Sequence, residues 1–201
     1  MWVYDFLRWS FNLLFSVLFR AEFSGMEHIP QTGRVILAAN HMSNADPPLI
    51  GCHLPRRISY ICKEELFHVP VIGWVLRETK TIPIKRGTGD RGAIRAAQQA
   101  LRAEQMIALF PEGHRAKNGH MRKAQAGVGL LAALSGAPVI PVAILGTEKI
   151  FANGGFLPKL RVIYGEPMYY MGDKKDKAAM AAFSQSILDR VAAMRAAAQA
   201  R

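Results

Sequence analysis

The sequence predicts an α/β fold: a single domain with a mostly parallel or mixed central sheet flanked by helices, preceded by an N-terminal interfacial helix. Its 201 residues are the length of one ordinary domain, and 50% of them are hydrophobic. Beyond Pro30, short apolar runs typical of strands alternate with stretches long enough for helices. We therefore expect an interfacial helix within residues 1–22 and one α/β domain over residues 23–201.

The N-terminal helix is expected to bind a membrane surface without crossing the bilayer. The eleven residues between Arg8 and Arg20 would extend about 17 Å as a helix, well short of the roughly 30 Å hydrocarbon core. In the interface, Trp2, Tyr4 and Trp9 would lie at headgroup level, and the two arginines would contact lipid phosphates. The alternative is a helix that packs on the domain as part of its core.

The remaining elements follow in the order expected of an α/β sheet. Strands are predicted at 34–39, 58–62, 81–85, 106–110, 139–145 and 160–164. Helices are predicted at 46–53, 71–79, 90–103 and 124–135, with an Ala-rich terminal helix at 177–201. Several strands are nearly continuous apolar runs, as expected of strands buried on both faces. Ligands bind beyond the carboxyl ends of such strands, so the residues just after each strand are the candidates for a site.

Composition narrows the possible partners. Lys and Arg number 26 against 15 Asp and Glu, a formal net charge of +11, which favours a negatively charged partner. The basic residues are scattered and form no recognised nucleic-acid-binding motif, so a nucleic acid is not expected.

No signal-peptide cleavage site follows the N-terminal segment, and the two cysteines form no CxxC pair. We expect a reducing compartment and buried structural thiols, rather than a Cys52–His53 nucleophile pair, because adjacent residues rarely face each other.

The residues after the strand at 34–39 suggest a general base. His41 precedes Asp46 by five residues on a short loop entering a helix, so imidazole and carboxylate can meet. Imidazole ordinarily titrates near neutrality and can take a hydroxyl proton, while a carboxylate on its other nitrogen fixes the tautomer. Asn40 and Ser43 would hold this loop through local hydrogen bonds. The alternative is that Asp46 is only a helix N-cap and His41 a satisfied polar group.

A second polar segment, residues 110–115, follows the strand at 106–110. Its glycine, Gly113, allows the backbone to approach a ligand. Arg115 offers a fork of donors suited to phosphate, and Glu112 can orient that arginine or receive a substrate hydroxyl. The alternative is a proline-glycine turn with a surface ion pair.

Two more apolar strands complete the pattern. The segment 82–87 delivers Lys85 and Arg86 to the same edge of the sheet. The segment 138–147 carries little chemistry and is interpreted mainly as a core strand.

Together these segments resemble the 1-acylglycerol-3-phosphate acyltransferase family of the glycerolipid acyltransferases. Its four ordered blocks are N-H-x4-D, a block ending in Arg, F-P-E-G-[ST]-R and a V-P-V-like strand. The corresponding residues are 40–46, 82–87, 110–115 and 139–142, and the resemblance covers about residues 25–166. One residue departs from the pattern, because His114 stands where the family usually has Thr or Ser.

The resemblance implies two groups of site residues. The catalytic pair would be His41 as general base and Asp46 as its partner. The residues implied to bind substrate are Arg86, Glu112, Gly113 and Arg115, with Lys85 and Lys123 as further candidates. The arginines would bind the acceptor phosphate, and the Glu-Gly pair would shape the acceptor site.

The resemblance also implies a reaction. A fatty-acyl group would pass from acyl-CoA or acyl carrier protein to the free hydroxyl of 1-acylglycerol-3-phosphate, giving phosphatidate for phospholipid biosynthesis. Neither a metal nor a cofactor beyond this co-substrate is expected. The basic excess suits an anionic membrane surface, and the expected location is peripheral or monotopic on the cytoplasmic face of the cell membrane. The alternatives are related acyltransferases acting on another lysophospholipid, glycerol-3-phosphate or an amino-acid lipid.

Overall fold

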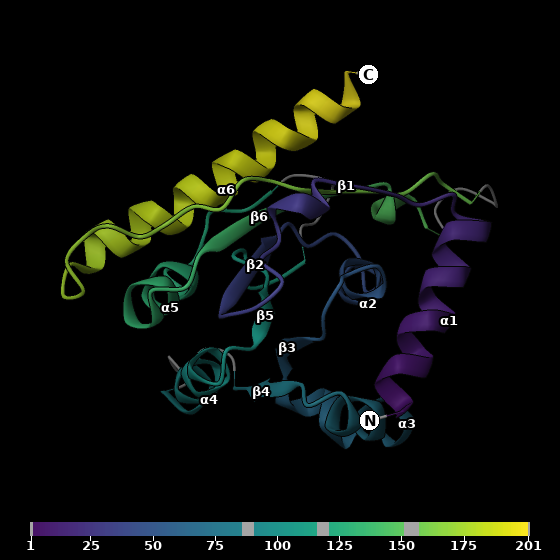
Figure 1. Ribbon diagram of the computed structural model, residues 1–201, viewed down its shortest axis with the longest axis horizontal. Coiled ribbons are helices and arrows are strands. Elements are labelled where there is room, and N and C mark those ends of the chain that lie inside the picture. Colours follow the sequence, from purple (N-terminus) through teal and green to yellow (C-terminus); the bar gives the residue numbers. More distant parts are fainter. Residues whose placement is uncertain (1, 86–90, 116–120, 151–156, 201) are drawn as a thin grey trace.

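A seven-stranded sheet lies at the centre of the computed structural model, which describes residues 2–85, 91–115, 121–150 and 157–200 (Figure 1). Its strands are β1 (Glu22–Ser24), β2 (Val35–Ala39), β3 (Ile58–Lys63), β4 (Ile82–Ile84), β5 (Met106–Leu109), β6 (Val139–Leu145) and β7 (Arg161–Tyr164). They are ordered β1-β7-β6-β2-β5-β3-β4. The five strands from β6 to β4 run parallel, while β7 is antiparallel to β6 and β1 is parallel to β7. This confirms the predicted mostly parallel, mixed sheet.

Helices connect these strands, mostly where the sequence predicts them. They are α1 (Trp2–Leu18), η1 (Met26–His28), α2 (Asp46–Cys52), η2 (Glu64–His68), α3 (Pro70–Glu78), α4 (Arg91–Arg102), α5 (Gly127–Ser135), η3 (Thr147–Lys149) and α6 (Lys177–Gln199). The main difference is at α5, which begins three residues later than predicted. There the backbone N–H of Ala124 donates to the Gln185 side chain and that of Gln125 to the Pro111 carbonyl, so these residues are held outside the helix.

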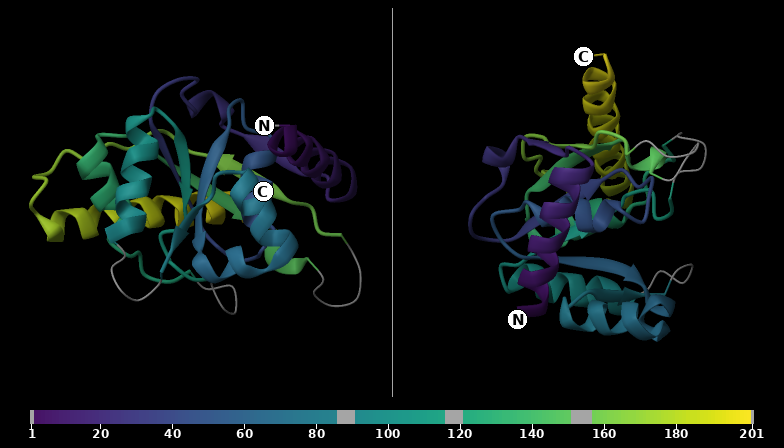
Figure 2. Two further views of the ribbon diagram at one scale, coloured as in Figure 1. Left: turned by 90° about the horizontal axis from the view of Figure 1, so that it is seen from below. Right: turned by 90° about the vertical axis from the view of Figure 1, so that its right-hand side faces the viewer.

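The two faces of the sheet carry different helices. Along β2, Val35, Leu37 and Ala39 belong to a core cluster with residues of α1 and α2. The alternate residues Ile36 and Ala38 pack into a second cluster, with residues of α4, α5 and α6. Figure 1 shows α1 and α2 on one side of the strands and α4, α5 and α6 on the other, and Figure 2 shows the strands between these layers. This three-layer arrangement buries both faces of the sheet, as the continuous apolar runs predict.

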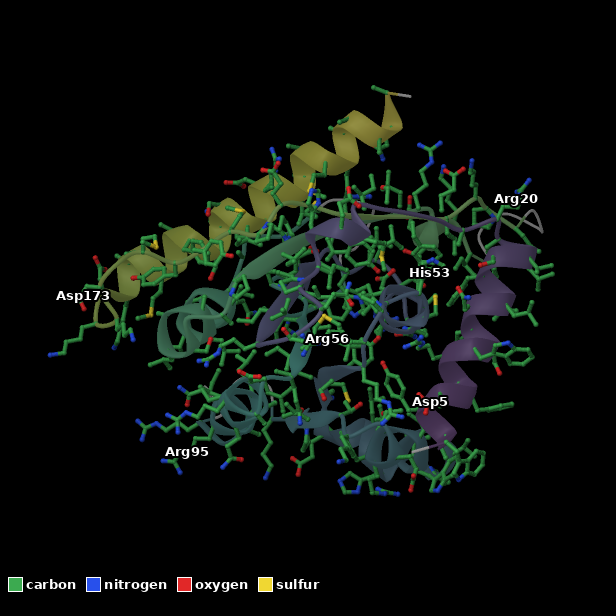
Figure 3. All side chains as sticks on the ribbon, viewed as in Figure 1. Asp5, Arg20, His53, Arg56, Arg95 and Asp173 are labelled. Atoms are coloured by element: carbon green, nitrogen blue, oxygen red, sulfur yellow. The ribbon has the colours of Figure 1, made fainter. Side chains whose placement is uncertain are left out.

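One face of α1 is built into the domain. Phe15 is buried in the same core cluster as α2. The hydroxyl of Tyr4 accepts a hydrogen bond from the backbone N–H of Ile58 at 3.0 Å, and Asp5 pairs with Arg57 at 2.6 Å. Figure 3 shows Asp5 near the N-terminal end of this helix. These contacts fix α1 against the start of β3.

The other face of α1 is exposed and apolar. Its side chains that are at least half exposed are Trp2, Phe6, Trp9, Leu13 and Val17. Tyr4, which we expected at headgroup level, is only 6% exposed and turns inward because its hydroxyl bonds the β3 backbone. None of the helices among the described residues is both long and apolar enough to cross a bilayer.

Candidate active site

The adjacent strands β2 and β5 bring the His41 and Glu112 segments together. They are hydrogen-bonded in parallel register, with Ala38 opposite Leu109. The chain therefore leaves both strands side by side at the carboxyl edge of the sheet, where ligands bind in open α/β folds. The His41 ring stacks on Phe110 with the ring centroids 4.0 Å apart.

His41 and Asp46 form the predicted pair. The His41 Nδ1 lies 2.9 Å from Asp46 Oδ2, which also accepts the backbone N–H groups of Met42 and Ser43, each at 2.7 Å. Asp46 is fully buried, whereas the His41 side chain is 13% exposed. A carboxylate accepts hydrogen bonds, so this contact assigns the Nδ1–H tautomer and leaves the Nε2 lone pair able to accept a proton. Asp46 bonds the loop before α2, which is not the N-cap geometry of the alternative interpretation.

Asn40 joins this loop to β6. Its side chain is buried, donates from Nδ2 to the Ile144 carbonyl at 3.0 Å and accepts the Ile144 N–H at 2.8 Å. The reciprocal pair continues the contact between β2 and β6 beyond the end of the β2 ladder. The prediction of local bonds is confirmed for Ser43, whose Oγ accepts the Ala45 N–H, and is wrong for Asn40. The residues around Asn40 carry no signal for β6, because that strand lies about a hundred residues away.

Glu112 fixes the backbone beside the His41–Asp46 pair. Its Oε1 accepts the N–H of His41 at 3.0 Å, and its Oε2 accepts the N–H of Arg122 at 2.8 Å. The residue is only 2% exposed. Both carboxylate oxygens therefore bond backbone amides and not the Arg115 guanidinium, which Glu112 was expected to orient. The Arg115 side chain is exposed. This geometry connects three loops at the edge of the sheet.

The turn after β5 depends on Gly113. This residue has φ +69°, a conformation that side chains other than glycine rarely adopt. A Cβ built there would also lie 2.5 Å from the Gln125 side chain. The Gly113 N–H donates to the Phe110 carbonyl at 2.9 Å, and the Gln125 N–H donates to Pro111 at 2.8 Å. The turn thus has a fixed shape next to His41.

A pocket of about 520 Å³ opens beside His41, within the range of roughly 300–1,000 Å³ typical of ligand sites. Its polar lining consists of His41, Lys85, His114 and Gln125. Its apolar lining includes Ile61, Ile84, Ile94, Leu109, Val128 and Leu131. Among the described residues that line it, none is acidic. A basic, partly apolar pocket suits an anionic ligand with a hydrocarbon portion.

The structure brings only some of the predicted substrate-binding residues to this pocket. Lys85 and Gly113 line it, and the Lys85 ammonium also lies 3.6 Å from a Glu64 carboxylate oxygen. Arg115 and Lys123 are exposed and do not line it, whereas Arg86 lies outside the described residues. Two pocket residues, His114 and Gln125, were not among the predicted site residues. The departure of His114 from the family pattern could have indicated that residue. Nothing in the sequence around Gln125 indicated a place in the pocket.

The prediction of buried thiols is confirmed for Cys52 and wrong for Cys62, which is only partly buried. Cys52 is buried, and its thiol donates to the Leu49 carbonyl at 3.2 Å. Burial raises the pKa of the Cys52 thiol to about 12, so it is a poor nucleophile. His53 instead stacks on Phe23 and bonds Asn12. In the part of the chain that the structure describes, no group of three His, Cys, Asp or Glu side chains is placed to hold a metal ion.

The fold and this site define a class: an α/β protein in which a carboxylate-aligned imidazole faces a basic pocket at the sheet edge. The profile of the Acyltransferase family matches residues 20–145, so the chain belongs to that family. It is similar to the 1-acyl-sn-glycerol-3-phosphate acyltransferase BAT2 of Brassica napus, with 29% identity over 79% of this chain and 47% of that one. It is also similar to the 1-acyl-sn-glycerol-3-phosphate acyltransferase of Bacillus subtilis, with 24% identity over 94% and 95% of the two chains.

A solved structure supports the same assignment. The crystal structure of the 1-acyl-sn-glycerophosphate (LPA) acyltransferase PlsC from Thermotoga maritima has a TM-score of 0.78 and 27% identity to this chain. The match covers 99% of this chain and 79% of that one. The chain spans about half the length of BAT2 and of a second chloroplast relative, from Arabidopsis thaliana. The resemblance and the fold predicted from the sequence are confirmed.

Proposed function

We propose that this chain transfers a fatty-acyl group from the thioester of acyl-CoA or acyl carrier protein to the free hydroxyl of 1-acylglycerol-3-phosphate, giving phosphatidate. The observation that carries this proposal is the 2.9 Å contact between His41 and buried Asp46 at the wall of a pocket that also contains Lys85. The names of the similar proteins supply the acceptor. The donor is inferred from the chemistry of activated acyl groups.

The proposed reaction uses His41 as a base and then as an acid. Nε2 removes the proton of the acceptor hydroxyl while the oxygen attacks the thioester carbonyl carbon. Asp46 stabilises the resulting imidazolium through Nδ1–H. The tetrahedral intermediate collapses, the C–S bond breaks, and the thiolate takes the proton from Nε2. The products are an ester and a free thiol, and no acyl-enzyme forms.

Charge complementarity is the second part of the proposal. Lys85 faces the pocket, and Arg115 follows the turn that carries His114. We assign these two, together with Arg86, to the acceptor phosphate, and Lys123 to a weaker peripheral contribution. Arginine is suited to this task because it presents two parallel donors to phosphate oxygens.

An acyl-transfer assay tests the function. The purified chain is given each thioester donor with a panel of acceptors: lysophosphatidate, glycerol-3-phosphate, another lysophospholipid and a lyso amino-acid lipid. We expect phosphatidate from lysophosphatidate, nearly complete loss in His41→Ala, and normal turnover in His68→Ala, an exposed histidine outside the pocket. No transfer to lysophosphatidate from either donor would refute the proposal, and faster transfer to another acceptor would favour the related activities.

We also propose that the exposed face of α1 lies on an anionic membrane, on the cytoplasmic face of the cell membrane. Support comes from the apolar side chains of that face and from Arg20, which is exposed at the end of the helix (Figure 3). The variant Trp9→Glu should reduce co-sedimentation with phosphatidylglycerol vesicles. The matched control is Met171→Glu, because Met171 is an exposed apolar residue outside the helices. Equal co-sedimentation of the two variants would contradict this orientation of α1.

A further inference from the structure

His114 is the residue at which this chain departs from the family pattern, and it lines the same pocket as His41 and Lys85. Its side chain is exposed to solvent at the pocket. In the part of the chain that the structure describes, it has no hydrogen-bond partner. Its ring is therefore available to a ligand.

The backbone around His114 is fixed relative to the proposed base. The preceding turn is closed by the Gly113 N–H to Phe110 carbonyl bond of 2.9 Å. One residue earlier, Glu112 accepts the His41 N–H at 3.0 Å. The two imidazoles thus project from segments that are bonded to each other. A ligand in the pocket can contact both.

The charged groups on the pocket lining and on the segments that carry it are mostly cationic. From the strand ends, His41 follows β2 and Lys85 follows β4. From its own segment, Arg115 is exposed next to it, and Arg122 and Lys123 precede α5. The pocket-lining helix α4 carries Arg91 and Arg95, both exposed. The nearby carboxylates are Glu112, which bonds two backbone amides, and Glu64, which lies against Lys85. An anion is the ligand that this surrounding favours.

We propose that His114 is an acceptor-binding residue whose imidazole, when protonated, pairs with the acceptor phosphate and strengthens acceptor binding in weak acid. This inference rests on the proposed function, because it assumes a phosphorylated acceptor. The Ser or Thr usual in the family offers a hydroxyl at this position but no charge. The consequence is a split between the two histidines. Acid removes the neutral His41 that accepts the proton and so lowers kcat, whereas acid charges His114 and so lowers the KM for the acceptor.

The test is the ratio of the acceptor KM of His114→Thr to that of the unchanged protein, measured from pH 5.5 to pH 8.5. The acceptor phosphate itself titrates in this range, but the effect of its charge on the remaining cations is common to both proteins, so the ratio isolates the contribution of residue 114. We expect a ratio of about three to five at pH 6 that falls toward about one at pH 8.5, as for one solvent-exposed charge pair. The donor KM should not change. His68→Thr serves as control, because this exposed histidine lies outside the pocket.

A binding measurement separates this inference from the proposed function. The imidazole C–H signals are followed by NMR during addition of glycerol-3-phosphate, and the His114 signal is the one missing in His114→Thr. A saturable shift of that signal, with the pH-dependent ratio, supports the inference. Any of three results would overturn it. The KM ratio could stay constant with pH, it could be equal with a phosphate-free monoacylglycerol acceptor, or the His114 signal could stay unmoved. Shifted His114 signals in a protein that fails to acylate lysophosphatidate would instead retain the phosphate site and overturn the proposed function.

Discussion

Glu112→Gln removes one hydrogen-bond acceptor from the site without changing the shape of the side chain. The carboxylate accepts two backbone N–H groups, from His41 and Arg122, at 3.0 and 2.8 Å. An amide has one acceptor oxygen, so its NH₂ group must face the other N–H, donor against donor. A hydrogen bond to a charged group contributes about 1.5–3 kcal/mol, and burial of the residue prevents water from replacing it. For a chain of this size that predicts a Tm lower by about 3–12 °C.

The same substitution should act on turnover more than on binding. If the lost bond is the one to His41, the base moves relative to the acceptor hydroxyl, and kcat should fall about ten- to a hundredfold with little change in KM. The assay is steady-state acyl transfer, with thermal unfolding measured on the same preparations. The matched control is Glu27→Gln, because Glu27 is an exposed carboxylate in η1. An unchanged Tm and kcat would refute the positioning role, and a raised acceptor KM with normal kcat would show that Glu112 contacts the acceptor.

Three other predictions follow from the site. His41→Ala and Asp46→Ala should each remove most turnover in a folded protein, the Asp change being the milder because Asp46 orients the base; normal acyl transfer by folded His41→Ala would exclude the mechanism. Arg86→Ala and Arg115→Ala should each weaken acceptor binding by about 1.5–3 kcal/mol, less than additively in a double-mutant cycle, and should spare a phosphate-free acceptor. Cys52, whose pKa burial raises to about 12, should resist iodoacetamide at pH 8 until the protein is unfolded.

The sequence predicts the sheet well because its signals are local. The apolar runs that became β2 and β6 are buried along their whole length, and this is what continuous hydrophobicity indicates. The strand β1 is missing from the prediction, because its three residues, Glu22–Ser24, carry no strand pattern and gain order only by pairing with β7. The reversed direction of β7 is equally invisible, because one strand's composition does not say which neighbour it joins or in which sense.

The N-terminal helix shows that one segment can both pack on the domain and keep an exposed apolar face. Its apolar residues outnumber what one face of a helix can bury, and sequence alone cannot say which of them face the domain. In the structure, Phe15 is in the core and Tyr4 bonds the β3 backbone, while Trp2 and Trp9 remain exposed. The packing alternative is thus correct for one face. For the same reason, deletion of the whole segment is a poor test of membrane binding, because it would also expose core residues around Phe15.

At the site, the sequence predicts which residues gather but not what each one bonds. His41 and Asp46 meet because only four residues lie between them, a distance that a short loop can close. The hydrogen bonds of Asn40 and Glu112 are made to residues far along the chain: Asn40 bonds Ile144, and Glu112 bonds the amides of two other loops. No local sequence pattern predicts such partners.

These hydrogen bonds have a consequence for the mechanism. Asp46 fixes the imidazole ring and Glu112 fixes the backbone that carries it, so the proposed base is restrained from two sides by carboxylates that do not themselves need to touch substrate. The proposed thioester donor is already activated, and for such a donor a rigidly placed base beside a cationic pocket would be sufficient chemistry.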